Sequence, residues 1–342
     1  MLTDLLRQTK DDITAVRRVL RTNEQVRSVL FTRPDPLVDV HRQLFPPALT
    51  GFLPDVTKWR IFDHVAAITR LYALFERCVR ESVKVWLRFL PLAVPAYTDL
   101  SEHIRAAHRR GIAKVLQNLE QQRFRHISLT ALTQQFNNAI SGVAPYELNP
   151  EAFLFTETNF RRETIEAIYN SVSINEAWKW IHRSRFVIEY LDTVGRGPTT
   201  PESELREFVG YRNDAAHGLV DQVLGIATLL ELADFIEALC TAVCEMVTWE
   251  ALSQRLKSGS AVELGETTEG FKSGAVVAKM NAVEVALDDK VYIAGESCCL
   301  TATVKSIHVM DVPQPRITVA AGTEVGFMFD VPVPKNRKIY RW

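Results

Sequence analysis

The stretch WRIFDHVAAITRLYALFERCVRESVKVWLRFL, residues 59–90, repeats an apolar side chain every three or four positions. The repeating positions are Ile61, Val65, Ile68, Leu71, Phe75, Val79, Val83, Trp86 and Leu90. A helix of 3.6 residues per turn gathers positions spaced in this way on one face. The spacing therefore predicts a long helix with a buried stripe, ending near Pro91 and Pro95 because proline breaks a helix.

Further helices are expected on both sides of this one. The apolar periodicity predicts helices at 1–31, about 99–122, near 159–171, about 175–194 and about 221–256, with a loop-rich connection through Pro145 and Pro150. The helix at 221–256 is apolar nearly all round, which is typical of a helix at the centre of a bundle. The first part of the chain is thus predicted to be all-α.

The composition changes after Leu256, where KSGSAVELGETTEGFKSG reads as a linker rich in Gly, Ser, Thr and Glu. Segments with β-branched and aromatic residues follow at 274–287, 290–294, 299–310, 315–319 and 324–332. Short strands in this number suit a small barrel or sandwich. We therefore divide the chain into an N-terminal helix and connection (1–55), a helical domain (56–257), a linker (258–273) and a small all-β domain (274–342).

The overall composition is that of a soluble globular protein. The chain has 342 residues, 47% of them hydrophobic and 24% charged, and a net charge of −1. No global positive field attracts nucleic acid, so an RNA site has to be a local patch. The sequence shows no secretion signal and no run of 18 apolar residues, which predicts a cytoplasmic protein without a membrane segment.

The cysteines are five, an odd number, and scattered, which favours reduced thiols. Cys240 and Cys244 lie on the apolar last helix and are read as packing residues. Cys298 and Cys299 could be redox-active, but ordinary buried thiols are the favoured reading. No zinc-type spacing is present beyond one C-x3-C pair, so neither a metal site nor a cofactor is predicted.

The segment FVGYRNDAAHGLV, residues 208–220, places Arg212 and His217 at a helix end. Thr200 as N-cap and Pro201 in the first turn predict a helix from about 201 to about 217. On that helix Asn213 and His217 share a face, and Arg212 lies about 140° around the axis from His217.

An imidazole and a guanidinium together suit the cleavage of RNA. The imidazole can move a proton on or off a ribose hydroxyl, and the guanidinium can hold the phosphate as negative charge develops. This division of labour requires no metal. The alternative is a structural role for Arg212 and His217 as an ion pair or cap at the helix end, since both cations suit a helix C-terminus.

Two segments considered together, LYALFERCVRE (71–81) and VGYRNDAAHG (209–218), give the helical part a resemblance to the HEPN superfamily. It looks most like the prokaryotic HEPN-like nucleases. The matching features are a Tyr-Ala-x-Phe-Glu pattern at Tyr72, Phe75 and Glu76, and Arg-Asn-x-x-x-His-Gly before a hydrophobic final helix. The resemblance covers residues 55–256 approximately. The first helix is a candidate for inclusion in it.

The resemblance implies an all-α HEPN helical bundle followed by the small β domain. HEPN bundles pair two-fold, so that the Arg/His motifs of both protomers line one cleft. By analogy His217 is the general acid/base, Arg212 stabilises the phosphate, and Asn213 orients the site. Glu76 matches an acidic position that could hold His217 or Arg212; the alternative is an ion pair with Arg80, four residues on.

A second candidate site is the basic stretch HIRAAHRRGIAKVLQNLEQQRFRH, residues 103–126, which contains a single acid, Glu120. This stretch could track an RNA backbone. The other reading is a solvated helix face, which charged runs often form. Its candidate RNA-binding residues are Arg105, Arg109, Arg110, Lys114, Arg123 and Arg125.

The function predicted on this basis is a metal-independent endoribonuclease of a toxin–antitoxin or antiviral defence system. It would cut single-stranded or loop RNA, with tRNA among the candidates, and leave 2′,3′-cyclic phosphate and 5′-hydroxyl ends, because the ribose is the nucleophile. Expected partners are RNA, a second copy of the chain and an antitoxin or defence protein. The alternatives are a non-catalytic module that binds RNA or a nucleotide and regulates a partner, and a scaffold.

Overall fold

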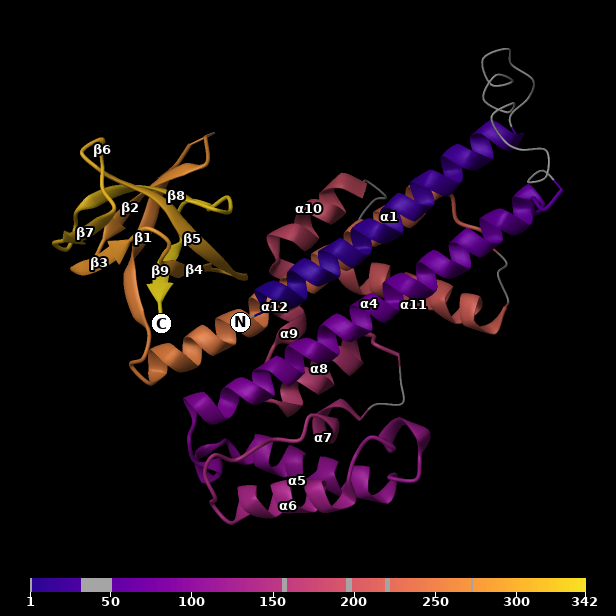
Figure 1. The fold of residues 1–342 in the computed structure, drawn as a ribbon, viewed down its shortest axis with the longest axis horizontal. Coiled ribbons are helices and arrows are strands. Elements are labelled where there is room, and N and C mark those ends of the chain that lie inside the picture. The colour runs from indigo at the N-terminus through magenta and orange to yellow at the C-terminus, as the bar shows by residue number, and fades with distance from the viewer. Residues whose placement is uncertain (1, 32–50, 156–158, 195–198, 219–221, 272) are drawn as a thin grey trace.

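The computed structural model describes residues 2–31, 51–155, 159–194, 199–218, 222–271 and 273–342, which form a helical bundle followed by a β-barrel (Figure 1). The described residues contain ten α-helices: α1 (Thr3–Phe31), α4 (Val56–Ala93), α5 (Glu102–Gln117), α6 (Leu129–Ile140), α7 (Glu151–Leu154), α8 (Arg162–Ser171), α9 (Ala177–Arg183), α10 (Arg185–Val194), α11 (Pro201–His217) and α12 (Ile226–Lys257). None of the helices described is both long and apolar enough to cross a lipid bilayer.

The long helices α1, α4 and α12 pack against one another and form the centre of the bundle (Figure 1). The predicted stripe of α4 is buried, with Ile68 fully inaccessible and Trp86 at 1% exposure. The helix runs past Pro91 to Ala93, although the sequence predicted its end at the proline. Pro91 lies in the last turn, and the Val94 N–H still donates to the Leu90 carbonyl at 2.8 Å, so the chain makes one more helical bond before it turns.

Helix α1 is part of this bundle, although the sequence division set residues 1–55 apart. Ile13 is fully buried, and Arg17 pairs with Asp234 at 2.5 Å and with Glu237 at 2.7 Å, both on α12. Residues 32–50 of that division lie outside the described part of the chain. The helical unit therefore includes the N-terminal helix.

Two other helical boundaries differ from the prediction. Helix α6 lies in the stretch expected to be loop; the Ser128 hydroxyl caps it by accepting from the Ala131 N–H at 3.3 Å, and Leu132 is buried at 1% exposure. The helix expected at 175–194 is divided into α9 and α10, because Ser184 between them has an extended backbone. Short or interrupted helices give weak periodicity, which explains both differences.

The strands form a closed barrel, which decides between the two β architectures expected. Six strands close in the order β4-β9-β1-β2-β8-β5, with β5 pairing back to β4. A bulge between Val304 and Ser306 bends β5, which lets the long strand pair with β4 at one end and β8 at the other. The strands are β1 (Val262–Gly270), β2 (Ala275–Met280), β3 (Val283–Ala286), β4 (Lys290–Gly295), β5 (Cys298–Val309), β6 (Val312–Pro313), β7 (Arg316–Val319), β8 (Glu324–Phe329) and β9 (Lys338–Arg341).

Strand β1 occupies most of the segment that the sequence predicted to be a linker. Leu264 and Thr267 face inward and are fully buried, and the Thr267 hydroxyl donates to the Pro334 carbonyl at 2.9 Å. Gly265 permits the close approach of β2, because a Cβ there would lie 2.4 Å from the Lys279 carbonyl oxygen. Its Glu, Thr and Gly residues resemble a linker in composition, and only the pairing with β2 and β9 makes them a strand.

The barrel docks on the C-terminal half of α12, at the left in Figure 1. Leu252 of α12 and Tyr292 and Tyr340 of the barrel belong to one buried cluster, and the Trp342 ring stacks on Tyr292 at 3.8 Å. Cys298 and Cys299 are buried thiols at this interface, and Cys240 and Cys244 pack inside the bundle, as predicted. The two parts of the chain thus share a buried interface.

The buried His108 of α5 is expected to make stability depend on pH. Its Nε2 accepts from the Asn149 N–H at 3.3 Å, so Nδ1 carries the proton and donates to the Tyr97 hydroxyl at 3.2 Å. Burial lowers the pKa of His108 from 6.5 to about 4. Because the unfolded chain binds the proton first, stability is lost as pH falls below about 6.5, by about 2 kcal/mol between pH 7 and pH 5.

Urea unfolding at the two pH values measures this loss. The loss between pH 7 and pH 5 should be smaller by about 2 kcal/mol in His108→Gln than in the wild type. His103→Gln, at an exposed position of the same helix, should keep the full loss. An undiminished loss in His108→Gln would contradict the assignment.

Candidate functional site

Helix α11 carries the Arg/His motif and spans Pro201–His217, as predicted. The Thr200 hydroxyl accepts from the Ser203 N–H at 3.2 Å and caps the first turn. Gly218 ends the helix with a φ of +70°, and its N–H bonds to the Asp214 carbonyl. A left-handed backbone suits glycine at this position, so the helix stops directly after His217.

Arg212 is half-buried, and an aromatic ring and a side-chain amide hold it. Its guanidinium carbon lies 4.8 Å from the centre of the Tyr72 ring on α4, and Nη1 donates to the Asn213 Oδ1 at 3.2 Å. Within the described residues Arg212 forms no ion pair, whereas Arg17, Arg80 and Arg185 all pair with acids. Among the described contacts, neutral groups alone therefore hold the Arg212 guanidinium.

A short network of side chains surrounds Arg212. The Asn159 Nδ2 donates to the Asn213 Oδ1 at 2.8 Å, and the Tyr72 hydroxyl lies 3.5 Å from the Asn159 Oδ1. The Phe160 N–H donates to the same Tyr72 hydroxyl at 3.0 Å. Burial raises the pKa of Tyr72, so its hydroxyl keeps the proton that it donates. Three parts of the chain thus meet at Arg212: helix α4, helix α11 and the segment that precedes α8.

His217 lies in the last turn of α11 and is exposed. In the part of the chain that is described, its imidazole makes no hydrogen bond and no ion pair. The structural alternative was an ion pair or cap made by Arg212 and His217. The described contacts include no such pair or side-chain cap: the backbone of Gly218 caps the helix, and Arg212 contacts Tyr72 and Asn213.

Glu76 forms the ion pair with Arg80, with 2.9 Å between Oε1 and Nε. Among the described contacts none joins Glu76 to Arg212 or His217. Arg80 also donates to the Leu154 carbonyl at 3.3 Å, which ties α4 to α7. Glu76 still lies close enough to Tyr72 to raise the pKa of its hydroxyl. Among the described contacts, the Glu76 carboxylate therefore binds Arg80 and not the Arg/His pair.

The basic stretch lies on α5 and the segment after it, away from α11, which packs on α4 (Figure 1). Glu102, just before the stretch, pairs with Arg105 at 3.0 Å and with Arg109 at 2.5 Å. Arg123 stacks on the Phe155 ring at 4.1 Å. The remaining candidates have exposed side chains; they are Arg110, Lys114 and Arg125. The structure does not bring this stretch together with Arg212 and His217.

The sequence analysis did not include Tyr72 and Asn159 among the candidate site residues, although both belong to the network around Arg212. Tyr72 was part of the pattern that carried the resemblance, so a signal for it existed. Asn159 had none, because it lies 54 residues from Asn213 in the chain and belongs to no motif.

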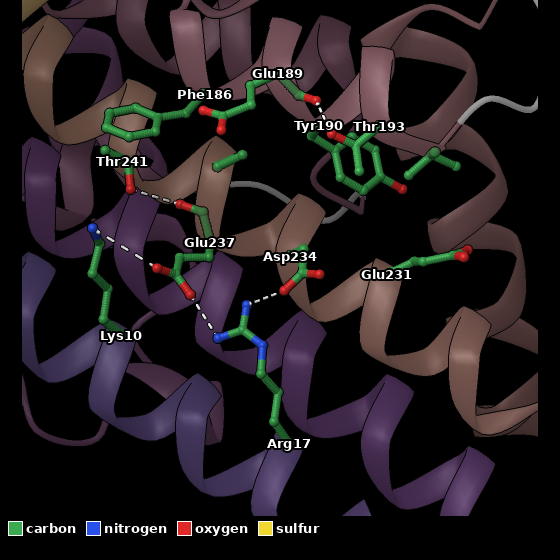
Figure 2. A pocket seen from close by; sticks show the side chains of 12 residues that line it. Lys10, Arg17, Phe186, Glu189, Tyr190, Thr193, Glu231, Asp234, Glu237 and Thr241 are labelled. Carbon is green, nitrogen blue, oxygen red and sulfur yellow. Dashed lines mark hydrogen bonds and ion pairs between the residues drawn. The ribbon is translucent and has the colours of Figure 1, made fainter.

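Figure 2 shows a separate cavity of about 490 Å³ between α1, α10 and α12. In it Arg17 lies between Asp234 and Glu237, and Lys10 approaches Glu237 to 3.8 Å. These ion pairs join α1 to α12, and no residue of α11 lines the cavity. In the described part of the chain, no three His, Cys, Asp or Glu side chains are grouped so that they could hold a metal ion.

A comparison with protein families gives a match to the family described as HEPN_MAE_28990-like HEPN, over residues 1–256. The chain belongs to this HEPN family. The match begins before α1 and ends in the last turn of α12, so it includes the first helix and excludes the barrel. The resemblance found in the sequence is thereby confirmed for the HEPN helical domain. A comparison with curated proteins found no match.

Proposed function

We propose that this HEPN protein is a metal-independent endoribonuclease whose site is built on Arg212 and His217. One observation carries the proposal: a half-buried arginine, which contacts the Tyr72 ring and donates to the Asn213 amide, lies five residues before an exposed histidine at a helix end. Such an arginine offers its charge to a phosphate, and the imidazole can exchange a proton with a ribose hydroxyl.

The chemistry proposed is transesterification within the RNA. The ribose 2′-hydroxyl gives its proton to a base and attacks the phosphorus, and the bond to the 5′-oxygen breaks as that oxygen gains a proton. His217 serves in proton transfer, Arg212 holds the phosphate, and Asn213 fixes Arg212. The products are a 2′,3′-cyclic phosphate and a 5′-hydroxyl, and flexible single-stranded or loop RNA, tRNA included, suits the in-line geometry.

A homodimer through the HEPN domain is part of the proposal. Arg212 and His217 lie about 140° apart around α11, so one copy presents them in different directions. A second copy placed two-fold across α11 would bring motifs from both chains to one cleft. A toxin–antitoxin or antiviral role, with a partner protein that controls the activity, is the biological setting that we propose.

The test is cleavage of total RNA and tRNA in excess EDTA, with mapping of the ends. The wild type should cleave and leave cyclic phosphates, and Arg212→Ala should reduce the rate by about 10²- to 10³-fold. Arg206→Ala, an exposed arginine of the same helix, is the matched control and should cleave like the wild type. Cleavage that EDTA abolishes, or that survives Arg212→Ala, would contradict the proposal.

The same arrangement also favours a second candidate, a HEPN module that binds RNA or a nucleotide without cutting it. The observation behind it is that His217 is held by no hydrogen bond in the described residues, whereas Arg212 is already held by Asn213 and the Tyr72 ring. For this function, Arg212→Ala weakens binding while the wild type shows no turnover.

A further inference from the structure

We infer that Asn159 is a positioning residue for Arg212, acting through Asn213. The inference rests on the proposed ribonuclease site and adds to it a residue from outside the Arg/His motif. Asn159 lies in the segment before α8, and its side-chain amide makes the only described hydrogen bond between that segment and the Asn213 side chain.

The Asn213 Oδ1 is the atom that links the two residues. It accepts from the Arg212 Nη1 at 3.2 Å and from the Asn159 Nδ2 at 2.8 Å. An amide oxygen has two lone pairs, so these two bonds use its accepting capacity. Without the Asn159 donor, the Asn213 amide can rotate about its last side-chain bond, and Arg212 then loses its acceptor.

Asn159 itself is held by its side-chain Nδ2 and by its backbone carbonyl. Its Oδ1 faces the Tyr72 hydroxyl at 3.5 Å while its Nδ2 is bound to Asn213. Its backbone carbonyl accepts from the Arg161 N–H at 2.8 Å and from the Thr164 hydroxyl at 2.9 Å, which hold it to the first turn of α8. Through these bonds Asn159 connects the first turn of α8 to Asn213 on α11.

Tyr72 contacts both Arg212 and Asn159. The same side chain supplies the ring under the Arg212 guanidinium, 4.8 Å away, and the hydroxyl next to Asn159. The guanidinium is therefore bound on its face by Tyr72 and at one edge by Asn213. Its other N–H groups keep a fixed direction, which a phosphate requires for bonds of good geometry.

A double-mutant cycle on the full chain tests the inference, with wild type, Asn159→Ala, Arg212→Ala and the double variant. Asn159→Ala should lower kcat for RNA cleavage about 10- to 100-fold and raise KM by less than about tenfold. In the Arg212→Ala background the same change should cost less than about twofold, because residues that act as a unit are not additive. Equal costs in both backgrounds, or an unchanged kcat, would overturn the inference.

A control variant excludes a general loss of folding. Asn170→Ala alters an exposed asparagine of α8 and should leave kcat, KM and the melting temperature unchanged. If Asn159→Ala lowers the melting temperature, the Arg212→Ala background carries the same structural damage, so the coupling between the two sites still separates positioning from folding.

Binding of a 2′-deoxy oligonucleotide, which lacks the nucleophile, separates this inference from the proposed function. Asn159→Ala should raise its Kd about three- to tenfold when Arg212 is present and less than about twofold when it is absent. If the wild type does not cleave RNA but shows this coupling, the nuclease proposal fails and the positioning role stands. If the wild type cleaves and the coupling is missing, the positioning role fails alone.

Discussion

Replacement of His217 by alanine is expected to reduce RNA cleavage by about 10²- to 10⁴-fold, the contribution typical of a general acid or base. The fold should be unaffected, because the imidazole is exposed and is bonded to none of the described residues. The measurement is the single-turnover rate on one defined RNA, in EDTA, together with the melting temperature of each variant.

His182→Ala is the matched control for this experiment. His182 is also an exposed histidine in the last turn of a helix, α9, and lies outside the proposed site. It should retain the wild-type rate. Should purified His217→Ala cleave as fast as His182→Ala, the imidazole has no part in the reaction and the proposed mechanism fails.

The second large effect is expected for Arg185→Met, which should lower the free energy of unfolding. Glu245 of α12 is 6% exposed, and both of its oxygens accept from the Arg185 guanidinium, at 2.6 Å and 3.0 Å. Arg185→Met leaves this buried carboxylate with the Cys299 N–H, at 3.2 Å, as its remaining described donor. Breaking a buried ion pair from one side costs about 3–5 kcal/mol of unfolding free energy.

Urea unfolding at pH 7 measures this cost. Two further variants test whether the unpaired buried charge causes it. Arg183→Met breaks an exposed ion pair with Glu296 and should cost less than about 1 kcal/mol. The double variant Arg185→Met/Glu245→Leu removes both charges and should recover most of the loss, because no unpaired charge stays buried. Equal losses for Arg183→Met and Arg185→Met would show that burial of Glu245 does not matter.

Much of the helical bundle was predictable because its information is local. The apolar stripe of α4 and the cap, proline and glycine of α11 are signals that lie within each helix, and both helices form where they were expected. The pattern around Tyr72 and Arg212 was sufficient for the HEPN resemblance that the family comparison confirms. The helix α6 and the break at Ser184 gave weak periodicity and were missed.

The residue pattern alone was enough to divide the chain into a helical part and a β part, because hydrophobic periodicity and capping are properties of neighbouring residues. The packing of the folded chain was needed to show that β1 is a strand and that Asn159 reaches Asn213. The structure also chose between the two roles that the sequence left open for Glu76, in favour of the local pair with Arg80. Strand pairing and side-chain bonds across 54 residues depend on where distant segments meet in space. That meeting is set by the packing of the whole core, which no local pattern encodes.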